Sequence, residues 1–306
     1  MFDIDVNKED ASGTPLYVAA KWGHTEVVKE LLTHSNIDVN KGDESVTPLY
    51  RAAENGHTDV VKELLTHPDI DVNKGDELGT PLYRAADQGH TEVVKELLTH
   101  NKIDVNQEGK WGTPLCIAAE KGNADVVKEL LTHSNIDVKL ENKEGDTLLL
   151  KAARMGYLDI VKQMCQVNGV DKNHVNNLGY TPFLAAAEEG HADIVKYLHQ
   201  LGCVNMEQVD NSQAIYVFCK SSVFKTLVDI FVDPDVHDTQ LSSLLNVLYV
   251  SLQANIKCDC GEVKSPDSPK KSKEAKKSKE AIEKDAFKKT IKNRSMLKRI
   301  KDAALP

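Results

Sequence analysis

Histidine has the widest chemical range of the side chains in this sequence, because it can bind metals and transfer protons near neutral pH. Eight of its eleven copies fall into two sets: His24, His57, His90 and His191 follow a glycine, and His34, His67, His100 and His133 come ten residues after that position in the motif. A metal site needs several ligands within a few ångströms, whereas equivalent residues of stacked units lie about 10 Å apart. We therefore interpret both sets as structural residues that satisfy free carbonyls at helix ends.

The other reactive side chains form no catalytic or metal-binding pattern. Cys258 and Cys260 flank a single aspartate, and no second pair lies at zinc-binding spacing. The sequence contains no GxxxxGK[ST], GxGxxG, HExxH or GxSxG motif. Its six cysteines lack the spacing of a secreted disulfide scaffold, which favours a reducing compartment. These observations predict a protein without enzyme activity, metal or cofactor. They also predict that it lies in the cytoplasm, with the nucleus as the alternative.

The charge of the chain is divided unevenly along its length. From Lys257 to the end, 16 Lys+Arg oppose 8 Asp+Glu, which gives +8; residues 1–256 hold the other 22 and 39, which gives −17 and a total of −9. This division predicts a basic interaction tail, or a tail that contacts its own acidic body. No apolar run reaches the roughly 18 to 20 residues of a membrane span, and the first residues do not resemble a signal peptide.

A repeated motif organises most of the sequence. It begins with TPLYVAAKWGH at Thr14 and recurs at Thr47, Thr80, Thr113, Thr147 and Thr181, with a degenerate copy from Gln213. The interval is 33 residues and stretches to 34 in the later copies. A fixed period of this length is typical of stacked supersecondary units. The hydrophobic fraction of 41% is large enough for such a stack to bury a core, and the aromatic fraction of 5% favours helices.

Each unit has the start and stop signals of two short helices. Thr14 can cap a helix with its hydroxyl, Pro15 suits the first turn, and Gly23 can end the helix in a left-handed conformation. The first helix is then about two turns long. TEVVKELLTH from Thr25 predicts a second, amphipathic helix, with Val27, Val28, Leu31 and Leu32 on its apolar face. The polar stretch around IDVN predicts a turn or short hairpin.

These residues resemble the ankyrin-repeat family, whose signature combines TPLH, AA, GH, VVxLLL and DVN within 33 residues. The resemblance covers residues 1–232 and implies an all-α solenoid of helix-turn-helix units with protruding hairpin loops. It further implies that hairpin tips and first helices line a concave groove that binds proteins. Two departures stand out. The family's His after TPL, which usually joins a network between repeats, is replaced by Tyr17, Tyr50, Tyr83, Cys116, Leu150, Leu184 and Tyr216, and an extra residue precedes DVN.

Residues that vary between copies are the candidates for partner binding, because invariant ones are explained by the scaffold. The candidates in the groove are Lys21, Trp22, Arg51, Glu54, Asn55, Arg84, Asp87, Gln88, Trp111, Lys121, Arg154 and Met155. Further varying positions expected to line the groove are Val18, Leu78, Ile117, Glu120, Lys151, Glu188 and Glu189. The two tryptophans are the preferred anchors, since a half-exposed indole often anchors an interface. The alternative reading is a solvated surface that varies neutrally.

A modification is also implied by the resemblance. In ankyrin proteins an asparaginyl hydroxylase can act on the asparagine of a Leu-x5-Asp-Val-Asn turn. The matching asparagines are Asn40, Asn73 and Asn106. The alternative is an asparagine kept for its turn-forming conformation.

The two ends of the array differ from its middle. Residues 1–13 resemble the end of a repeat whose helices are absent, so we expect an exposed apolar surface on the first repeat. After the array, an apolar stripe at helical spacing predicts a covering helix over 233–256. Residues 257–306 contain a doubled KKSKEA and are expected to be disordered, or partly helical over 281–306.

The tail offers several kinds of contact. Ser265 and Ser268 precede prolines and are candidate phosphorylation sites. A basic helix there could bind calmodulin, an anionic membrane or an acidic protein, and the lysines could contact nucleic acid or direct nuclear import. The leading hypothesis is a non-catalytic interaction scaffold that binds a protein in the groove. The rival is nucleic-acid or chromatin association through the tail, with the repeats as scaffold.

Overall fold

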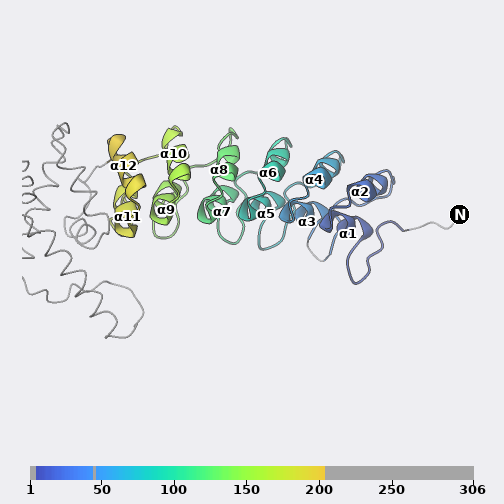
Figure 1. The fold of residues 1–306 in the computed structure, drawn as a ribbon. Coiled ribbons are helices and arrows are strands. Elements are labelled where there is room, and N and C mark those ends of the chain that lie inside the picture. The colour runs from blue at the N-terminus through green and yellow to red at the C-terminus, as the bar shows by residue number, and fades with distance from the viewer. Residues whose placement is uncertain (1–4, 44–45, 204–306) are drawn as a thin grey trace, which may run out of the picture. The chain divides into compact units, whose positions relative to one another are not determined.

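The computed structural model of the protein describes residues 5–43 and 46–203. Over these ranges the chain forms twelve α-helices and no strand, arranged as a repeat solenoid of helix pairs, as the sequence predicts (Figure 1). The chain divides into two units, Met1–Asn176 and Asn177–Pro306. The degenerate seventh copy, the expected covering helix and the tail, including Cys258, Cys260, Ser265 and Ser268, lie outside the described residues.

Each repeat contributes a first helix and a second helix. In the first unit these pairs are α1 (Pro15–Lys21) and α2 (Thr25–Leu32), α3 (Pro48–Glu54) and α4 (Thr58–Leu65), α5 (Pro81–Gln88) and α6 (Thr91–Leu98), α7 (Pro114–Lys121) and α8 (Ala124–Leu130), and α9 (Leu148–Met155) and α10 (Leu158–Gln166). In the described part of the second unit, α11 (Pro182–Glu189) and α12 (Ala192–Gln200) pack against each other.

Every first helix begins at a capping threonine. The hydroxyl of Thr14 accepts a hydrogen bond from the backbone N–H of Tyr17 at 3.2 Å. The same bond forms at Thr47, Thr80, Thr113, Thr147 and Thr181. Thr14 also donates its hydroxyl hydrogen to the carbonyl of Lys41, in the loop that leads to the next repeat, at 2.9 Å. The cap that starts a helix therefore also holds the loop that connects two repeats.

The glycine that ends each first helix has two roles. Gly23 and Gly56 adopt φ values of +73° and +74°, a left-handed conformation that disfavours other residues. A Cβ on Gly23 would lie 2.8 Å from the ring of His57, and one on Gly56 would lie 2.7 Å from the ring of His90. The glycine thus turns the chain and leaves room for the next repeat's histidine.

The core of the first unit lies between two rows of helices. First helices contact first helices and second helices contact second helices along the row, and each pair packs against itself. We call the side of a pair that faces the preceding repeat its front face and the opposite side its rear face. The alanine pairs such as Ala52 and Ala53 are fully buried, because small side chains let neighbouring helices approach closely.

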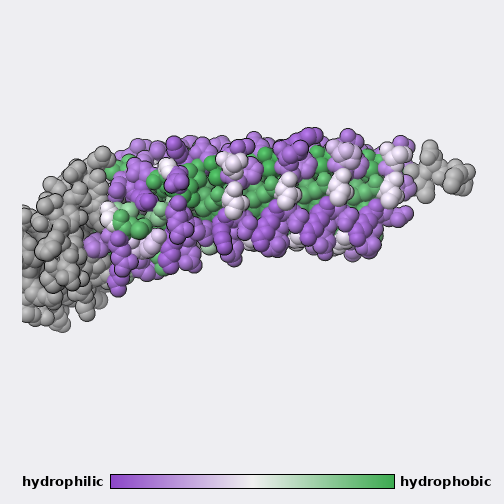
Figure 2. All heavy atoms as spheres, turned by 90° about the horizontal axis from the view of Figure 1, so that it is seen from above, coloured by the Kyte–Doolittle hydropathy of each residue, from purple (hydrophilic) through white to green (hydrophobic). Residues whose placement is uncertain are grey.

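The second helices are amphipathic, as predicted. Figure 2, which looks down on their row, shows an apolar band between polar margins. The partly covered leucines at or just after the ends of these helices are Leu32, Leu65, Leu98 and Leu131.

The loops between repeats project beyond the first helices in Figure 1 and are closed by isolated bridges rather than strands. The pairs are Asp10 with Gly13, Asp43 with Val46, Asp76 with Gly79, Gly109 with Gly112, and Glu141 with Thr147.

Candidate functional site

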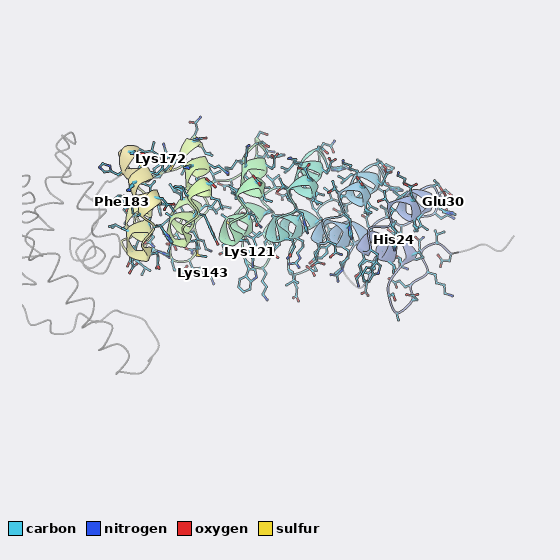
Figure 3. The ribbon with its side chains drawn as sticks, in the orientation of Figure 1. His24, Glu30, Lys121, Lys143, Lys172 and Phe183 are labelled. Carbon is cyan, nitrogen blue, oxygen red and sulfur yellow. The ribbon has the colours of Figure 1, made fainter. Side chains whose placement is uncertain are left out.

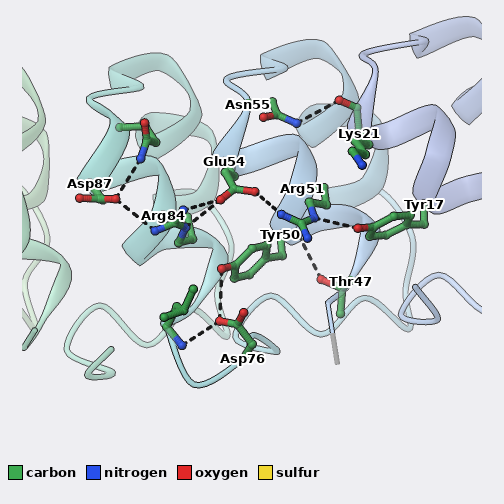
Figure 4. A network of polar contacts seen from close by, with 12 residues as sticks. Tyr17, Lys21, Thr47, Tyr50, Arg51, Glu54, Asn55, Asp76, Arg84 and Asp87 are labelled. Carbon is green, nitrogen blue, oxygen red and sulfur yellow. Dashed lines mark hydrogen bonds and ion pairs between the residues drawn. The ribbon is translucent and has the colours of Figure 1, made fainter. Parts of the chain in front are cut away.

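The charged groove candidates of repeats two and three form one network. Arg51 donates from Nε to the hydroxyl of Tyr17 at 2.8 Å and from a terminal nitrogen to Glu54 at 2.6 Å. Arg84 binds the other oxygen of Glu54 through Nε and a terminal nitrogen, and donates to Asp87 at 3.1 Å. Figure 4 shows this chain of alternating charges crossing three first helices. Arg51, Glu54, Arg84 and Asp87 are therefore mostly committed to contacts within the array.

The two arginines keep Glu54 ionised. Partial burial by itself would raise the pKa of Glu54, but the hydrogen bonds from Arg84 and Arg51 outweigh burial and lower it. Burial likewise acts against the charge of each arginine, yet the contacts with Tyr17 and Glu54 raise the pKa of Arg51 and those with Glu54 raise that of Arg84. Arg51, Glu54 and Arg84 therefore remain charged and stabilise one another at pH values around neutrality.

The tyrosines that replace the family's histidine supply polar contacts of their own. Tyr17 accepts from Arg51, and Tyr50 donates its hydroxyl hydrogen to Asp76 at 3.2 Å. Desolvation, added to the nearby Asp76 and Glu54 carboxylates, raises the pKa of Tyr50 despite the opposing charge of Arg84. The departure from TPLH thus exchanges one network between repeats for another, which the sequence alone did not reveal.

The network continues in weaker form along the row. Lys121 lies 3.8 Å from Asp87, Lys151 forms an ion pair with Glu120, and Arg154 bonds the buried carboxylate of Asp146 at 2.8 Å. Lys121 remains more than half exposed. Ile117, expected to line the groove, is instead buried in the core, because its side of α7 faces neighbouring helices.

The two tryptophans are the most exposed large apolar side chains in the described ranges, at 63% each. Trp22 ends α1, and Trp111 lies in the loop before α7. Each stacks with the lysine that precedes it, with Lys21 Nζ 5.7 Å and Lys110 Nζ 5.0 Å from the ring centroid. Sequence reasoning missed Lys110, although the repeated Lys-Trp dipeptide was a visible signal.

Trp111 has an exposed apolar neighbour in the adjacent loop. The backbone N–H of Lys110 donates to the carbonyl of Leu78 at 3.3 Å, so the two loop tips are in contact. Leu78 is exposed. Leu78, Lys110 and Trp111 together form a small amphipathic surface at the loop tips.

The remaining candidates differ in how much they are held. Asn55 donates to the carbonyl of Lys21 at 3.0 Å, and Gln88 donates to Asp87 at 2.9 Å. Met155 ends α9 with an exposed side chain. Glu188 and Glu189 end α11 in the second unit. The candidates therefore fall into two groups. Arg51, Glu54, Arg84 and Asp87 are held by contacts with one another, and a smaller set of exposed residues lies at first-helix ends and loop tips.

The asparagines considered for hydroxylation form a ladder between repeats. Asn40 donates from its amide to the carbonyl of Asp69 at 2.7 Å and accepts from the N–H of Asp71 at 2.8 Å. Asn73 and Asn106 repeat the pattern one repeat further on. The asparagine therefore stabilises the contact with the next loop as well as its own turn, and its hydroxylation stays a prediction.

Two histidines from each set make contacts within the array, of two different kinds. The Nε2 hydrogens of His57 and His90 are donated to the carbonyls of Lys21 and Glu54 in the preceding repeat, at 3.1 and 3.0 Å. The second set was expected to satisfy carbonyls and does not: His67 and His100 accept a backbone N–H at Nδ1 instead. This happens because the second helix ends two residues earlier, which leaves the ring beside the N–H groups of the turn.

The described ranges contain no group of three or more His, Cys, Asp or Glu side chains that could hold a metal ion. None of their helices is long and apolar enough to cross a membrane.

Comparisons with known proteins agree with this architecture. A family model described as ankyrin repeats (three copies) matches residues 1–76, 72–142, 115–210 and 149–239. The crystal structure of EF0377, an ankyrin repeat protein, has a TM-score of 0.56 and 34% identity over 61% of this chain and 96% of that one. The human ASB11 ankyrin repeat domain has a TM-score of 0.59 and 26% identity over 71% and 97%. No curated protein sequence matches the chain.

Proposed function

Because the chain belongs to the ankyrin-repeat family, whose repeats generally mediate protein–protein interactions, we propose that it is a non-catalytic scaffold that binds a protein partner through its first helices and loop tips. The observation that carries the proposal is the exposure of Trp22 and Trp111, at 63% each. A large exposed indole is costly to leave in water and is enriched among interface anchors.

The charged network supports a particular division of labour on this surface. Arg51, Glu54, Arg84 and Asp87 satisfy one another, so a partner gains little by competing for them. They hold neighbouring first helices in a fixed register. The exposed side chains would then discriminate between partners. They are Trp22, Leu78, Lys110, Trp111, Lys121 and Met155, with the half-buried Lys21 beside Trp22.

The experiment is quantitative affinity capture from a cell extract with the wild-type chain, Trp22→Ala and Trp111→Ala. Leu201→Ala is the control, because Leu201 is also an exposed apolar residue but follows a second helix. We expect each tryptophan variant to lose at least one protein that wild type and control retain. If both variants capture the same proteins in the same amounts as wild type, the chosen contact residues are wrong.

Deleting residues 257–306 separates this function from its rival. The tail carries +8 by sequence, so it can attract nucleic acid or acidic proteins by charge alone. Under our proposal the shortened chain keeps its tryptophan-dependent partners, and the tail contributes an additional electrostatic contact. Loss of every captured partner on deletion would favour the tail as the binding element.

A further inference from the structure

Two helices with the same sequence have very different surroundings. Thr25–Leu32 of α2 and Thr91–Leu98 of α6 both read TEVVKELL. Val93 of α6 is 1% exposed, whereas its equivalent Val27 in α2 is 49% exposed. Since the local sequence is identical, the difference comes from neighbours: α4 covers the front face of α6, whereas the main contacts of α2 among the described helices are with α1 and α4, on its other sides.

The polar groups of the same face are also left without their usual partners. His57 and His90 each donate to a carbonyl at the end of the preceding first helix. Glu63 and Glu96 each face a lysine of the preceding second helix, Lys29 at 3.8 Å and Lys62 at 3.6 Å. The equivalents in the first repeat are His24 and Glu30, which are exposed and make no such contact within the described residues (Figure 3).

The loop portion of this interface is already occupied by the chain itself. Asn7 donates to the carbonyl of Asn36 at 2.6 Å and accepts from the N–H of Asp38 at 2.8 Å, as Asn40 does one repeat later. The ladder therefore extends one step beyond the first helix pair. Among the described residues, no helix pair lies against the front face of α1 and α2.

We propose that the front face of the first repeat, formed by His24, Val27, Glu30 and Leu31, binds the rear face of a helix-turn-helix repeat on another protein molecule. The partner would present apolar side chains to Val27 and Leu31, a helix-end carbonyl to His24 and a lysine to Glu30. The argument is continuity: the same face of α3–α4 and of α5–α6 is covered in this way within the chain. This surface is separate from the one proposed to hold the partner above.

A symmetric pairing of two such faces fits less well. It would bring two copies of Glu30 together, and it would offer His24 no free carbonyl, because the carbonyl of Lys21 is already bound by Asn55 and His57. The polar groups therefore favour a rear face over a second front face.

A peptide taken from this chain can test binding to the front face of the first repeat. Residues 47–66, which include α3 and α4, form the rear face that covers α5 and α6. A fluorescent peptide of this sequence is titrated with the full chain, and binding is followed by anisotropy. We expect saturable binding that weakens at least tenfold in Val27→Glu. Leu201→Glu is the matched control, since Leu201 is similarly exposed, at 46%, and follows the second helix of another repeat, and it should leave binding unchanged.

A charge exchange tests the register of the contact. Glu30→Lys in the chain should weaken binding about threefold, and Lys62→Glu in the peptide should restore it, because the two side chains would face each other as Lys62 and Glu96 do.

Because the free peptide must fold as it binds, the same sequence is also joined to the N-terminus by a flexible Gly/Ser linker. The tether raises its local concentration to roughly millimolar. In this form, hydrogen exchange of the α2 amides should slow, and Val27→Glu should reverse the effect.

Three results would overturn the proposal. The first is the absence of binding in both the free and the tethered form. The second is an equal loss of binding in Val27→Glu and Leu201→Glu, which would mean unspecific apolar attraction. The third is a charge exchange that fails to restore affinity, which would mean that the peptide binds in another register.

Discussion

At the scale of single residues, polar side chains join repeats that lie about 30 positions apart in sequence. The asparagine ladder and the Tyr17–Arg51–Glu54–Arg84–Asp87 network use different chemistry for the same purpose. The ladder lies at the loops and uses backbone groups, whereas the network crosses the first helices and uses charges. Each contributes hydrogen bonds that a single isolated repeat could not form.

The ladder predicts a measurable loss of stability when one amide is removed. Asn73→Ala deletes a hydrogen bond to the carbonyl of Lys102 at 2.8 Å and one from the N–H of Asp104 at 2.9 Å. We expect the free energy of unfolding to fall by about 1 to 2 kcal/mol, measured by urea denaturation. Asn101→Ala, at an exposed position in the same turn region, is the control and should change it by less than about 0.5 kcal/mol. Equal losses would argue against the ladder.

The charged network predicts a dependence on pH. The pKa of Glu54 is lower in the folded chain than the value of about 4.3 expected when unfolded. Its contribution is therefore present above that value and is lost as the pH falls through the folded pKa. Glu54→Gln should destabilise the protein more at pH 7 than at about pH 3, as measured by urea denaturation at both. Glu92→Gln, whose carboxylate is largely exposed, should show no such difference.

At the scale of elements, the limits of each helix pair are set by local sequence signals, and its packing depends on the neighbouring repeat. The threonine cap and the left-handed glycine fix where a first helix starts and ends. The next repeat then places a histidine ring against that glycine. A position that looks like a simple helix stop is also part of the contact between repeats.

Gly56 and Gly202 separate these two effects. Both have positive φ, but a Cβ on Gly56 would lie 2.7 Å from His90, whereas one on Gly202 would meet nothing within 4 Å. Gly202→Ala should cost only the conformational penalty of about 1 kcal/mol. Gly56→Ala should cost about 2 to 4 kcal/mol, because the ring must also move. The comparison is made by thermal or urea unfolding, and equal costs would show that the ring moves freely.

At the scale of the whole molecule, stability depends on position in the stack. A repeat in the middle of the first unit has both faces covered, while the front face of the first helix pair is open among the described residues. In such quasi-linear proteins the contacts between neighbours carry much of the stability.

Two valines in identical helices measure this effect. Val93→Ala removes two buried methyl groups and leaves a cavity, so we expect a loss of about 2 to 3 kcal/mol in the free energy of unfolding. Val27→Ala makes the same change on the open face and should cost about 1 kcal/mol or less. Urea denaturation of the two variants provides the test. A similar loss for both would mean that the face of α2 is covered in solution.

The sequence by itself determined the period, the starts of the helices and the apolar positions that repeat in the core. These depend on interactions within about four residues, such as Thr47 with Tyr50 or the spacing of Val60, Val61 and Leu64, which any local pattern displays. It also placed Trp22 and Trp111 among the variable positions, and both prove exposed.

Only the tertiary structure decided which candidates are committed to the scaffold. Glu54 meets Arg84, and Asn40 meets Asp69 and Asp71, across intervals of about 30 residues. Their pairing depends on the register in which repeats stack, and that register is not visible in any local spacing. For the same reason the octapeptide TEVVKELL is buried in one repeat and open in another, because burial belongs to the neighbour rather than to the helix.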